Sequence, residues 1–306
     1  MYPKGPNPTK LLSAPRSPKK PVVLIHDGSG TTFAYFFIDG LNRDLWGLHD
    51  PNYWESKIWE GGLDAMAEHY IELIKKAGIK GEIILGGWSL GGTLSVKISR
   101  ILADDPNPPF TVSGLLIIDT PKHGPYSQLP EPLMDPDPSK LPKLIQQSFA
   151  NVDTYLEDWQ LPNWNAATNN GQPMTARAAG KKYEVGPSKK LHLPVEGDWV
   201  VRETEPFKFE DEKPEKPLGP PPAVLIRGAL YSKPPRETEQ KCTIDRYRDE
   251  PMLGWDGRYP DFILASLDVD SAHYDLFDKM DEKKLSHVVS RIKTSLAVLD
   301  SIVEGY

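Results

Sequence analysis

Short apolar runs and helical patterns alternate along the first part of this chain. The apolar runs occupy residues 21–25, 41–51, 83–88 and 115–118, and apolar residues recur at helical spacing over 63–74 and 94–102. Short continuous apolar runs are typical of strands buried on both faces of a parallel sheet. The order strand, helix, strand, helix, strand therefore predicts an α/β architecture, with a mostly parallel central sheet flanked by helices.

The regular alternation stops between residues 122 and 222. More than half of the 31 prolines fall here, together with one helical pattern at about 139–159 and a charged, proline-rich run over 204–222. A structureless connection of this length is uncommon inside the core of a sheet. We therefore expect an insertion, part helical and part extended, that forms a lid over the functional site. A separate small domain is the alternative.

The strand pattern resumes after the insertion, at residues 223–226 and 261–267. Between these strands, Leu253-Gly254-Trp255 lies in a loop with room for a small helix. Apolar residues over 285–303 mark a long amphipathic helix, which we expect to cover one face of the sheet. The chain contains no internal repeat.

At 306 residues, the chain fits one large α/β domain with an insertion. The first residues carry five prolines and scattered lysines, without the apolar core of a secretion signal, so we expect them to be flexible. The predicted organisation is a leader or linker at 1–20, a core formed by 21–121 and 223–306, and a lid insertion at 122–222.

Composition and charge limit the classes of partner. The net charge of −7 argues against nucleic acid, because phosphate binding needs a dense basic face. No window approaches about 18 uninterrupted apolar residues, so we expect no membrane span. Cys242 is the only cysteine, which excludes an intrachain disulfide and fits a cytoplasmic protein. It has no cysteine or histidine at ligand spacing, so we expect no metal site.

The most informative stretch follows the run at 83–88 and reads Gly87-Trp88-Ser89-Leu90-Gly91. This is a G-x-S-x-G pattern between a predicted strand and a predicted helix, the context in which it forms a nucleophile elbow. The sharp turn holds the serine hydroxyl clear of the sheet, at the N-terminus of the helix. Glycines on both sides remove Cβ atoms that would collide across so tight a turn.

The first predicted strand ends in the glycine-containing loop His26-Asp27-Gly28-Ser29-Gly30. Loops at the carboxyl ends of parallel strands line the binding crevice of open α/β sheets. In hydrolases of this architecture such a loop supplies one backbone N–H of the oxyanion hole, and the residue after the nucleophile supplies the other. We therefore expect Asp27, or its neighbour His26, and Leu90 to be the donors, and Gly28, Trp88 and Tyr274 to contact substrate together with His26.

A serine hydroxyl needs a base beside it and a group that orients that base. Of the seven histidines, only His273 lies in a loop after the final core strand, where α/β-hydrolases place their base. The others fall in predicted helices, in the insertion or in earlier loops: His26, His49, His69, His123, His192 and His287. We expect surface or packing roles for His69 and His287, and for His26 a packing or loop position rather than the role of the base.

The orienting acid is predicted from strand position. Asp119 ends the strand that follows the nucleophile's helix, and the chain order Ser, Asp, His is preserved. A neighbouring strand end can reach the imidazole, so Asp119 is the first choice. Asp268, Asp270 and Asp275 lie nearer to His273 in the sequence and remain as alternatives.

With these motifs in place, the chain resembles the type I thioesterase domains that end fungal polyketide synthases and nonribosomal peptide synthetases. The resemblance covers about 22–119 and 223–277. Its marks are HDGSG at 26–30, LWGLHDP at 45–51, MAEHYIELI at 66–74, LGGWSLGG at 85–92, LIIDTP at 116–121 and SAHYDLF at 271–277. The chain departs from the family in its proline-rich stretch at 186–222, because lids in the family are mostly helical.

The resemblance implies an α/β-hydrolase fold and a catalytic triad of Ser89, Asp119 and His273, with Asp27 and Leu90 at the oxyanion hole. It also implies that the serine takes an acyl chain from the phosphopantetheine arm of an acyl carrier protein, without a cofactor of its own. Release follows by hydrolysis or by cyclisation. Two alternatives stay open: a carbon–carbon bond-forming, Claisen-type cyclase with the same triad, and a catalytically silent binding scaffold.

Overall fold

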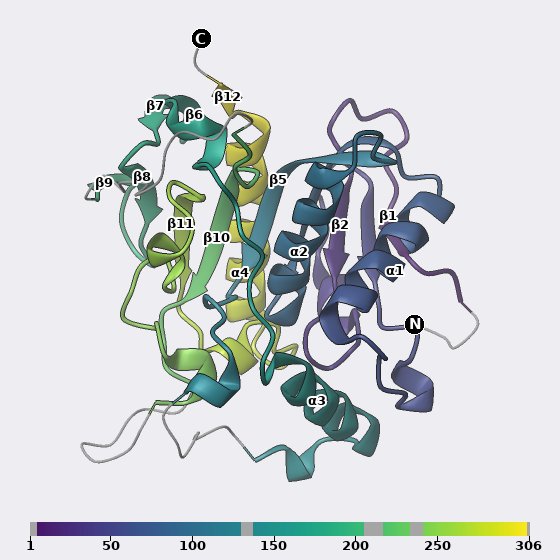
Figure 1. The fold of residues 1–306 in the computed structure, drawn as a ribbon. Helices are drawn as coiled ribbons and strands as arrows, with labels where there is room; N and C mark the ends of the chain where they lie inside the picture. The colour runs from purple at the N-terminus through teal and green to yellow at the C-terminus, as the bar shows by residue number, and fades with distance from the viewer. Residues whose placement is uncertain (1–4, 130–136, 205–216, 233–240, 305–306) are drawn as a thin grey trace.

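The computed structural model describes residues 5–129, 137–204, 217–232 and 241–304. Within these residues, a nine-stranded sheet has the strand order β1-β3-β2-β4-β5-β10-β11-β8-β9 (Figure 1). Its strands are β1 (Thr9–Leu12), β2 (Val22–Ile25), β3 (Leu45–Leu48), β4 (Gly81–Trp88), β5 (Phe110–Ile118), β8 (Lys189–Leu193), β9 (Val200–Glu203), β10 (Ala223–Gly228) and β11 (Ile263–Val269).

From β3 to β8, every neighbouring pair of strands is parallel, and β1 and β9 add antiparallel edges. The central strands β2, β5, β10 and β11 carry continuous runs of buried apolar residues, as strands covered on both faces require. Because parallel strands share one direction, their carboxyl ends meet along one edge of the sheet. The predicted α/β class is confirmed, and the predicted functional residues fall on this edge.

Helices cover both faces of the sheet. Helices α1 (Gly62–Lys76) and α2 (Leu90–Asp104) pack on one face, and α4 (Glu282–Asp300) packs on the other (Figure 1). Each face has its own apolar cluster, one including Met66, Tyr70 and Leu94 and the other including Val288 and Ile292. The apolar face predicted for the helix at 63–74 is confirmed, because these residues are the buried ones of α1: Leu63, Met66, Ala67, Tyr70, Ile71 and Ile74.

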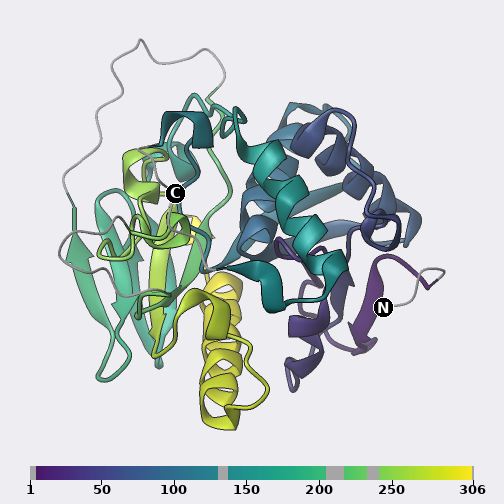
Figure 2. The ribbon, with the colours of Figure 1, turned by 90° about the horizontal axis from the view of Figure 1, so that it is seen from below.

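The region 122–222 does more than cover the sheet. Helix α3 (Lys143–Leu156) lies across the carboxyl edge of the strands (Figure 2), within the predicted helical pattern at 139–159. Strands β6 (Met174–Ala178) and β7 (Lys181–Val185) form a small sheet with β12 (Val303–Glu304), whereas β8 and β9 extend the main sheet beyond β11. The region predicted as a lid thus also supplies strands to the core. Residues 205–216 of the predicted proline-rich run lie outside the described residues.

The region predicted to be a flexible leader also contributes to the sheet. Strand β1 pairs antiparallel with β3. The carboxylate of Asp44 accepts hydrogen bonds from the backbone of Ala14 and from Lys10, at 2.7 and 2.8 Å. The Asn7 side chain exchanges two hydrogen bonds with the backbone of His49. These contacts order residues 5–20 at the sheet edge, where proline content alone predicted flexibility.

Candidate active site

The nucleophile candidate Ser89 lies in the sharp turn between β4 and α2. Its backbone has φ 55° and ψ −119°, a conformation that a residue with a side chain adopts only under strain. The Ser89 N–H donates to the carbonyl of Ile118 at 3.0 Å, which ties the turn to the end of β5. The predicted elbow geometry is therefore present in the structure.

The two glycines of the motif leave no room for a side chain. A Cβ atom on Gly91 would lie 2.3 Å from the carbonyl oxygen of Ile25, and one on Gly87 would lie 2.5 Å from the same oxygen. The Gly87 position would also be 2.8 Å from the Cα of Gly91. Contacts this short do not occur without movement of the backbone, so the collision predicted from the sequence is the reason for both glycines.

The structure brings Asp119 and His273 together. Asp119 follows β5 and has a left-handed backbone, with φ 44°, and His273 begins the 3₁₀ helix His273–Asp275 after β11. The Nδ1 atom of His273 donates to Oδ2 of Asp119 at 2.8 Å, and both side chains are buried. Because a carboxylate can only accept, Nδ1 carries the proton and Nε2 is left as an acceptor in the neutral ring.

The imidazole of His273 also lies beside the residue that precedes the nucleophile. Its ring centroid is 5.5 Å from that of Trp88. No hydrogen bond joins Ser89 to His273 among the described residues, which is common in ligand-free hydrolases whose catalytic contacts tighten when substrate binds. The strand ends thus gather the three candidate residues, with one of the two expected hydrogen bonds formed.

The alternative acids do not contact His273. Asp268 is buried and accepts from His192 Nε2 at 3.0 Å and from two nitrogens of Arg227, each at 2.8 Å. Asp270 and Asp275 are exposed, and neither forms a hydrogen bond to the His273 ring in the described part of the chain. Asp119 is therefore the carboxylate that this geometry favours as the orienting acid.

The carboxylate of Asp119 is held ionised by its surroundings. Burial alone would raise its pKa, but the Arg248 guanidinium and the hydrogen bond from His273 hold the pKa well below the usual range. Arg248 was not singled out from the sequence. It lies in a turn without a local motif, and only the folded chain brings it to Asp119.

The predicted oxyanion loop turns tightly beside the elbow. The Asp27 carboxylate accepts from the backbone and the hydroxyl of Ser29, at 3.3 and 2.5 Å, and burial raises its pKa. Leu90 is the first residue of α2, so its N–H has no acceptor within the helix. Within the described residues, no hydrogen bond occupies the N–H of Asp27.

A cavity of about 670 Å³ contains Ser89 in its wall. Asp27, Gly28, Trp88, Leu90 and Tyr274 also line this cavity. His26, expected to contact substrate, lies elsewhere: its ring is buried, with Nε2 2.5 Å from the Tyr70 hydroxyl. The structure thus gathers the predicted substrate residues except His26.

Helix α3 forms the apolar roof of this cavity. Its residues Ile145, Phe149, Val152 and Leu156 recur at helical spacing and line the cavity. Three cations line it as well, namely Lys122, Lys140 and Arg246. In the described parts of the chain none of the three forms an ion pair, although Lys122 and Arg246 each lie 5.6 Å from the ring of Tyr247. No spacing pattern in the sequence indicates this group of cations, because its members come from separate segments.

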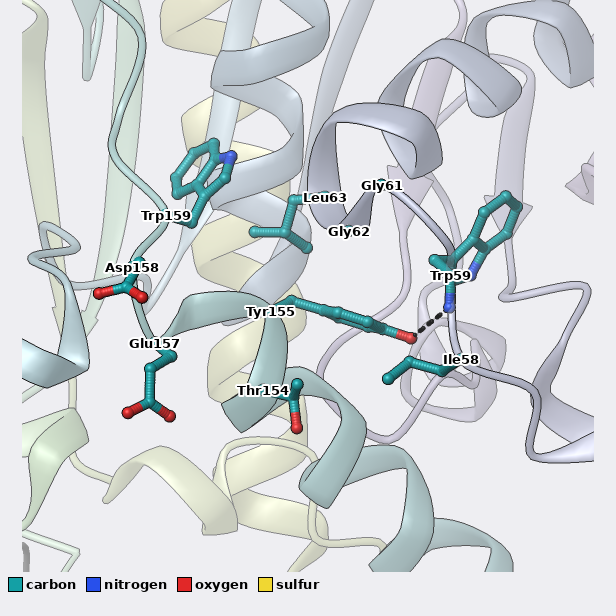
Figure 3. Close-up of a pocket in the computed structure, with 10 residues that line it drawn as sticks. All are labelled: Ile58, Trp59, Gly61, Gly62, Leu63, Thr154, Tyr155, Glu157, Asp158 and Trp159. Atoms are coloured by element: carbon teal, nitrogen blue, oxygen red, sulfur yellow. Dashed lines mark hydrogen bonds between the residues drawn. The ribbon is translucent and has the colours of Figure 1, made fainter.

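A second hollow of about 370 Å³ lies on another side of α3 (Figure 3). There the Tyr155 hydroxyl accepts a hydrogen bond from the backbone N–H of Trp59 at 2.8 Å. Just beyond the helix, the Trp159 indole donates to Asp64 of α1 at 2.8 Å. The C-terminal end of the roof helix is therefore fastened to the core.

Two further findings concern metals and membranes. Over the ranges that the structure describes, no group of three or more His, Cys, Asp or Glu side chains is arranged to hold a metal ion. Within the same ranges, no helix combines the length and apolar character needed to cross a bilayer.

Comparison with known proteins places the chain in a family. No protein-family model matches it. A probable thioesterase of Curvularia clavata is 41% identical over 281 residues, covering 92% of this chain and 91% of that protein. A probable thioesterase of Purpureocillium lilacinum is 37% identical over 289 residues, covering 92% of this chain and 90% of that protein.

Solved structures share the fold at low sequence identity. The thioesterase domain of NocB from the nocardicin cluster has a TM-score of 0.55 and 18% identity, covering 95% of this chain and 99% of that chain. A four-domain nonribosomal peptide synthetase has a TM-score of 0.51 and 17% identity, covering 90% of this chain and 19% of that chain. These likenesses show the α/β-hydrolase fold. Together with the curated relatives, they establish that this chain belongs to the family of fungal thioesterases.

Proposed function

We propose that this chain is a serine thioesterase that releases an acyl chain from the thioester of an acyl carrier protein through an acyl-serine intermediate. The observation that carries the proposal is the hydrogen bond between His273 and Asp119, set beside a strained Ser89 in the wall of a cavity with an apolar roof. A silent scaffold would not need this arrangement. Membership of a thioesterase family supports the same reaction type.

In the first half-reaction, Oγ of Ser89 attacks the thioester carbonyl carbon while Nε2 of His273 removes the hydroxyl proton. Asp119 keeps the ring in the tautomer that accepts at Nε2 and stabilises the imidazolium. Backbone N–H groups of Leu90 and Asp27 receive the oxyanion, and loss of one such donor typically costs about 100-fold or more in rate. The carbon–sulfur bond then breaks, and the thiolate takes the proton from His273.

In the second half-reaction, a nucleophile activated by His273 attacks the acyl-serine ester and restores Ser89. Water gives a free acid, and a hydroxyl, amine or carbon nucleophile of the acyl chain gives a cyclic product. The apolar roof formed by Ile145, Phe149 and Val152 suits a largely apolar acyl chain. The shape of this cavity decides which nucleophile reaches the ester first.

The cations of the cavity support a thiol arm that carries a phosphate. Lys122, Lys140 and Arg246 line the same cavity as Ser89 and have no carboxylate partner among the described residues. Cations without a partner in an otherwise acidic protein suit an anionic group of the substrate. Phosphopantetheine has such a group at the end opposite its thiol.

The test compares Ser89→Ala with the unchanged protein on two acyl thioesters, one of pantetheine and one of phosphopantetheine. We expect Ser89→Ala to abolish turnover of both and to prevent labelling by a fluorophosphonate, with the fold intact by circular dichroism. We expect Arg246→Gln to lower kcat/KM for the phosphorylated thioester only. Unchanged turnover in Ser89→Ala would refute the nucleophile, and mass spectrometry of the products would separate free acid from cyclic product.

A further inference from the structure

Asp119 has a second ionic partner besides His273. The Nη1 and Nη2 atoms of Arg248 donate to its two carboxylate oxygens at 2.6 and 3.0 Å, the fork geometry that matches a carboxylate plane. The backbone N–H of Gly228 donates to the same oxygen as Nη1, at 2.8 Å. With the bond from His273, each oxygen of Asp119 therefore accepts two hydrogen bonds.

Arg248 is itself fixed in place. Its Nε donates to Asp245 at 3.0 Å, and Nη1 also donates to the carbonyl of Gly228 at 2.9 Å. Arg248 is 2% exposed, and Asp119 and Asp245 are fully buried. A guanidinium held in this way prevents the Asp119 carboxylate from rotating about its Cβ–Cγ bond. Among the described side chains, only His273 also donates a hydrogen bond to this carboxylate.

The charges of this buried group have a functional consequence. Arg248 contributes one positive charge to this group, and Asp119 and Asp245 contribute one negative charge each, whereas an imidazolium at His273 would add a positive charge. Loss of the guanidinium makes the group more negative by one unit, and loss of the Asp245 carboxylate makes it less negative by one unit. Changes at Arg248 and at Asp245 should therefore alter the stability of the imidazolium in opposite directions.

We propose that Arg248 is a positioning residue of the active site, which fixes the Asp119 carboxylate for His273 and, balanced by Asp245, sets the pH range in which His273 works as a base. The proposal rests on the catalytic roles proposed above for these residues. A purely structural ion pair would stabilise the fold in the same way, but it would leave the pH dependence of the reaction unchanged.

Other charged and titratable groups also face His273 and would act equally in all variants. Asp27, in the loop after β2, is close enough for its charge to interact with the imidazole, and the ring of Tyr274 lies 5.0 Å away. Trp88 packs against the ring without a charge. The variants below change none of these three residues, so a change in pH dependence reports the group around Asp119.

The test measures the rate constant of fluorophosphonate labelling at Ser89 from acid to neutral pH, with thioester turnover measured in parallel. Labelling needs the nucleophile and its base but no carrier or natural acyl chain. For Arg248→Met we expect a loss of about 10- to 100-fold at the plateau, by analogy with the loss seen when a group that orients a metal-binding side chain is removed. We also expect the acidic limb of its labelling rate against pH to move to higher pH, because a more negative surrounding favours the imidazolium of His273.

For Asp245→Asn we expect the acidic limb of the pH profile of labelling to move to lower pH. For Arg248→Lys we expect a lower plateau rate, with the acidic limb at nearly the same pH as in the unchanged protein. The matched control is Arg43→Met, which removes a buried guanidinium that pairs with Asp300 and should affect stability alone. Arg43 lies just before β3, at the amino ends of the parallel strands and therefore at the opposite edge of the sheet from His273. If Arg248→Met does not fold, Asp245→Asn and Arg248→Lys still decide. Folded variants with unchanged profiles would overturn the proposal, whereas labelling without any thioester turnover would overturn only the proposed function.

Discussion

At the scale of single residues, two buried aspartates with different partners allow a direct test of the triad. Asp119 contacts His273, whereas Asp268 contacts His192 and Arg227. We expect Asp119→Asn to lower kcat by about 10⁴-fold, because an amide can favour the wrong imidazole tautomer while leaving the geometry intact. Steady-state turnover of an acyl thioester is the measurement. Asp268→Asn is the control, and a larger loss in that variant would show that the acid is misassigned.

The elbow glycines allow a second test at this scale. In Gly91→Ala the new Cβ would lie 2.3 Å from the Ile25 carbonyl oxygen, so the turn must shift. We expect loss of fluorophosphonate labelling and a decrease in the free energy of unfolding of about 1–3 kcal/mol, measured by urea denaturation. Gly257→Ala is the matched control, since no atom lies within 4 Å of its added Cβ. Equal behaviour of the two variants would contradict the steric argument.

The sequence predicts site residues best where a local motif or a strand end determines their position. Ser89 follows from the elbow pattern, and Asp119 follows from its place at the end of a buried strand. Arg248 could not be predicted in this way, because its role depends on a turn about 130 residues further along the chain folding back onto Asp119. His26 was expected to contact substrate from its loop position, but its ring turns inward to Tyr70.

At the scale of elements, the fastening of α3 determines how its apolar face meets the cavity. Its C-terminal end is held by the bond between the Tyr155 hydroxyl and the Trp59 backbone (Figure 3). We expect Tyr155→Phe to destabilise this end by about 1 kcal/mol, the usual net value of one hydrogen bond. Hydrogen exchange over 143–156 should become faster, and KM should rise with kcat nearly unchanged, because substrate binding is affected more than chemistry.

The control for this helix prediction is Tyr183→Phe in β7, whose hydroxyl forms no hydrogen bond among the described residues. It should change neither hydrogen exchange in α3 nor KM. An unchanged exchange rate in Tyr155→Phe would show that the helix is held by its apolar contacts alone.

Element prediction failed in one informative place. Strand β8 is buried, yet its sequence Lys189–Leu193 contains Lys190 and His192, which interrupt the apolar run. Lys190 pairs with Asp256, and His192 pairs with Asp268. Hydropathy treats such residues as exposed, so a strand whose buried polar side chains are paired by distant partners gives no sequence signal. Strands with apolar runs, such as β2 and β10, were predicted without difficulty.

At the scale of the whole molecule, polar side chains link the inserted strands to the core sheet. Arg227 of β10 pairs with Asp268 of β11, Asp268 with His192 of β8, and His192 with Arg202 of β9. Because the Arg202 Nε donates to Nδ1 of His192, that nitrogen accepts, and Nε2 carries the proton that is donated to Asp268. One row of side chains thus crosses four adjacent strands and joins the region 122–222 to the sheet.

This row predicts how the stability of the whole fold depends on pH. Burial alone would raise the pKa of Asp268, but the hydrogen bonds from His192 and Arg227 lower it below the usual value. In the unfolded chain the pKa of an aspartate is about 3.9. Because the pKa of Asp268 is lower in the folded state, its carboxylate stabilises the fold fully above that pH, and this stabilisation is lost as the pH falls toward the folded pKa. We expect Asp268→Asn to lower the free energy of unfolding at pH 7 by about 3 kcal/mol, because a buried ionic partner is removed. Below about pH 4, the free energy of unfolding of this variant should decrease less steeply with falling pH than that of the unchanged protein.

Urea denaturation at several pH values is the measurement, with the exposed Asp270→Asn as the matched control. The pKa of Asp119 is also lowered in the folded state, so Asp119 contributes a pH dependence of the same sign. The slope of the unfolding free energy against pH should therefore become smaller in Asp268→Asn without vanishing. Fluorophosphonate labelling of the folded variant should persist, since Asp268 does not contact His273. A pH dependence identical to that of the control would mean that the inserted strands are held by backbone pairing and apolar contacts, and that the charged row contributes nothing to the stability of the assembled sheet.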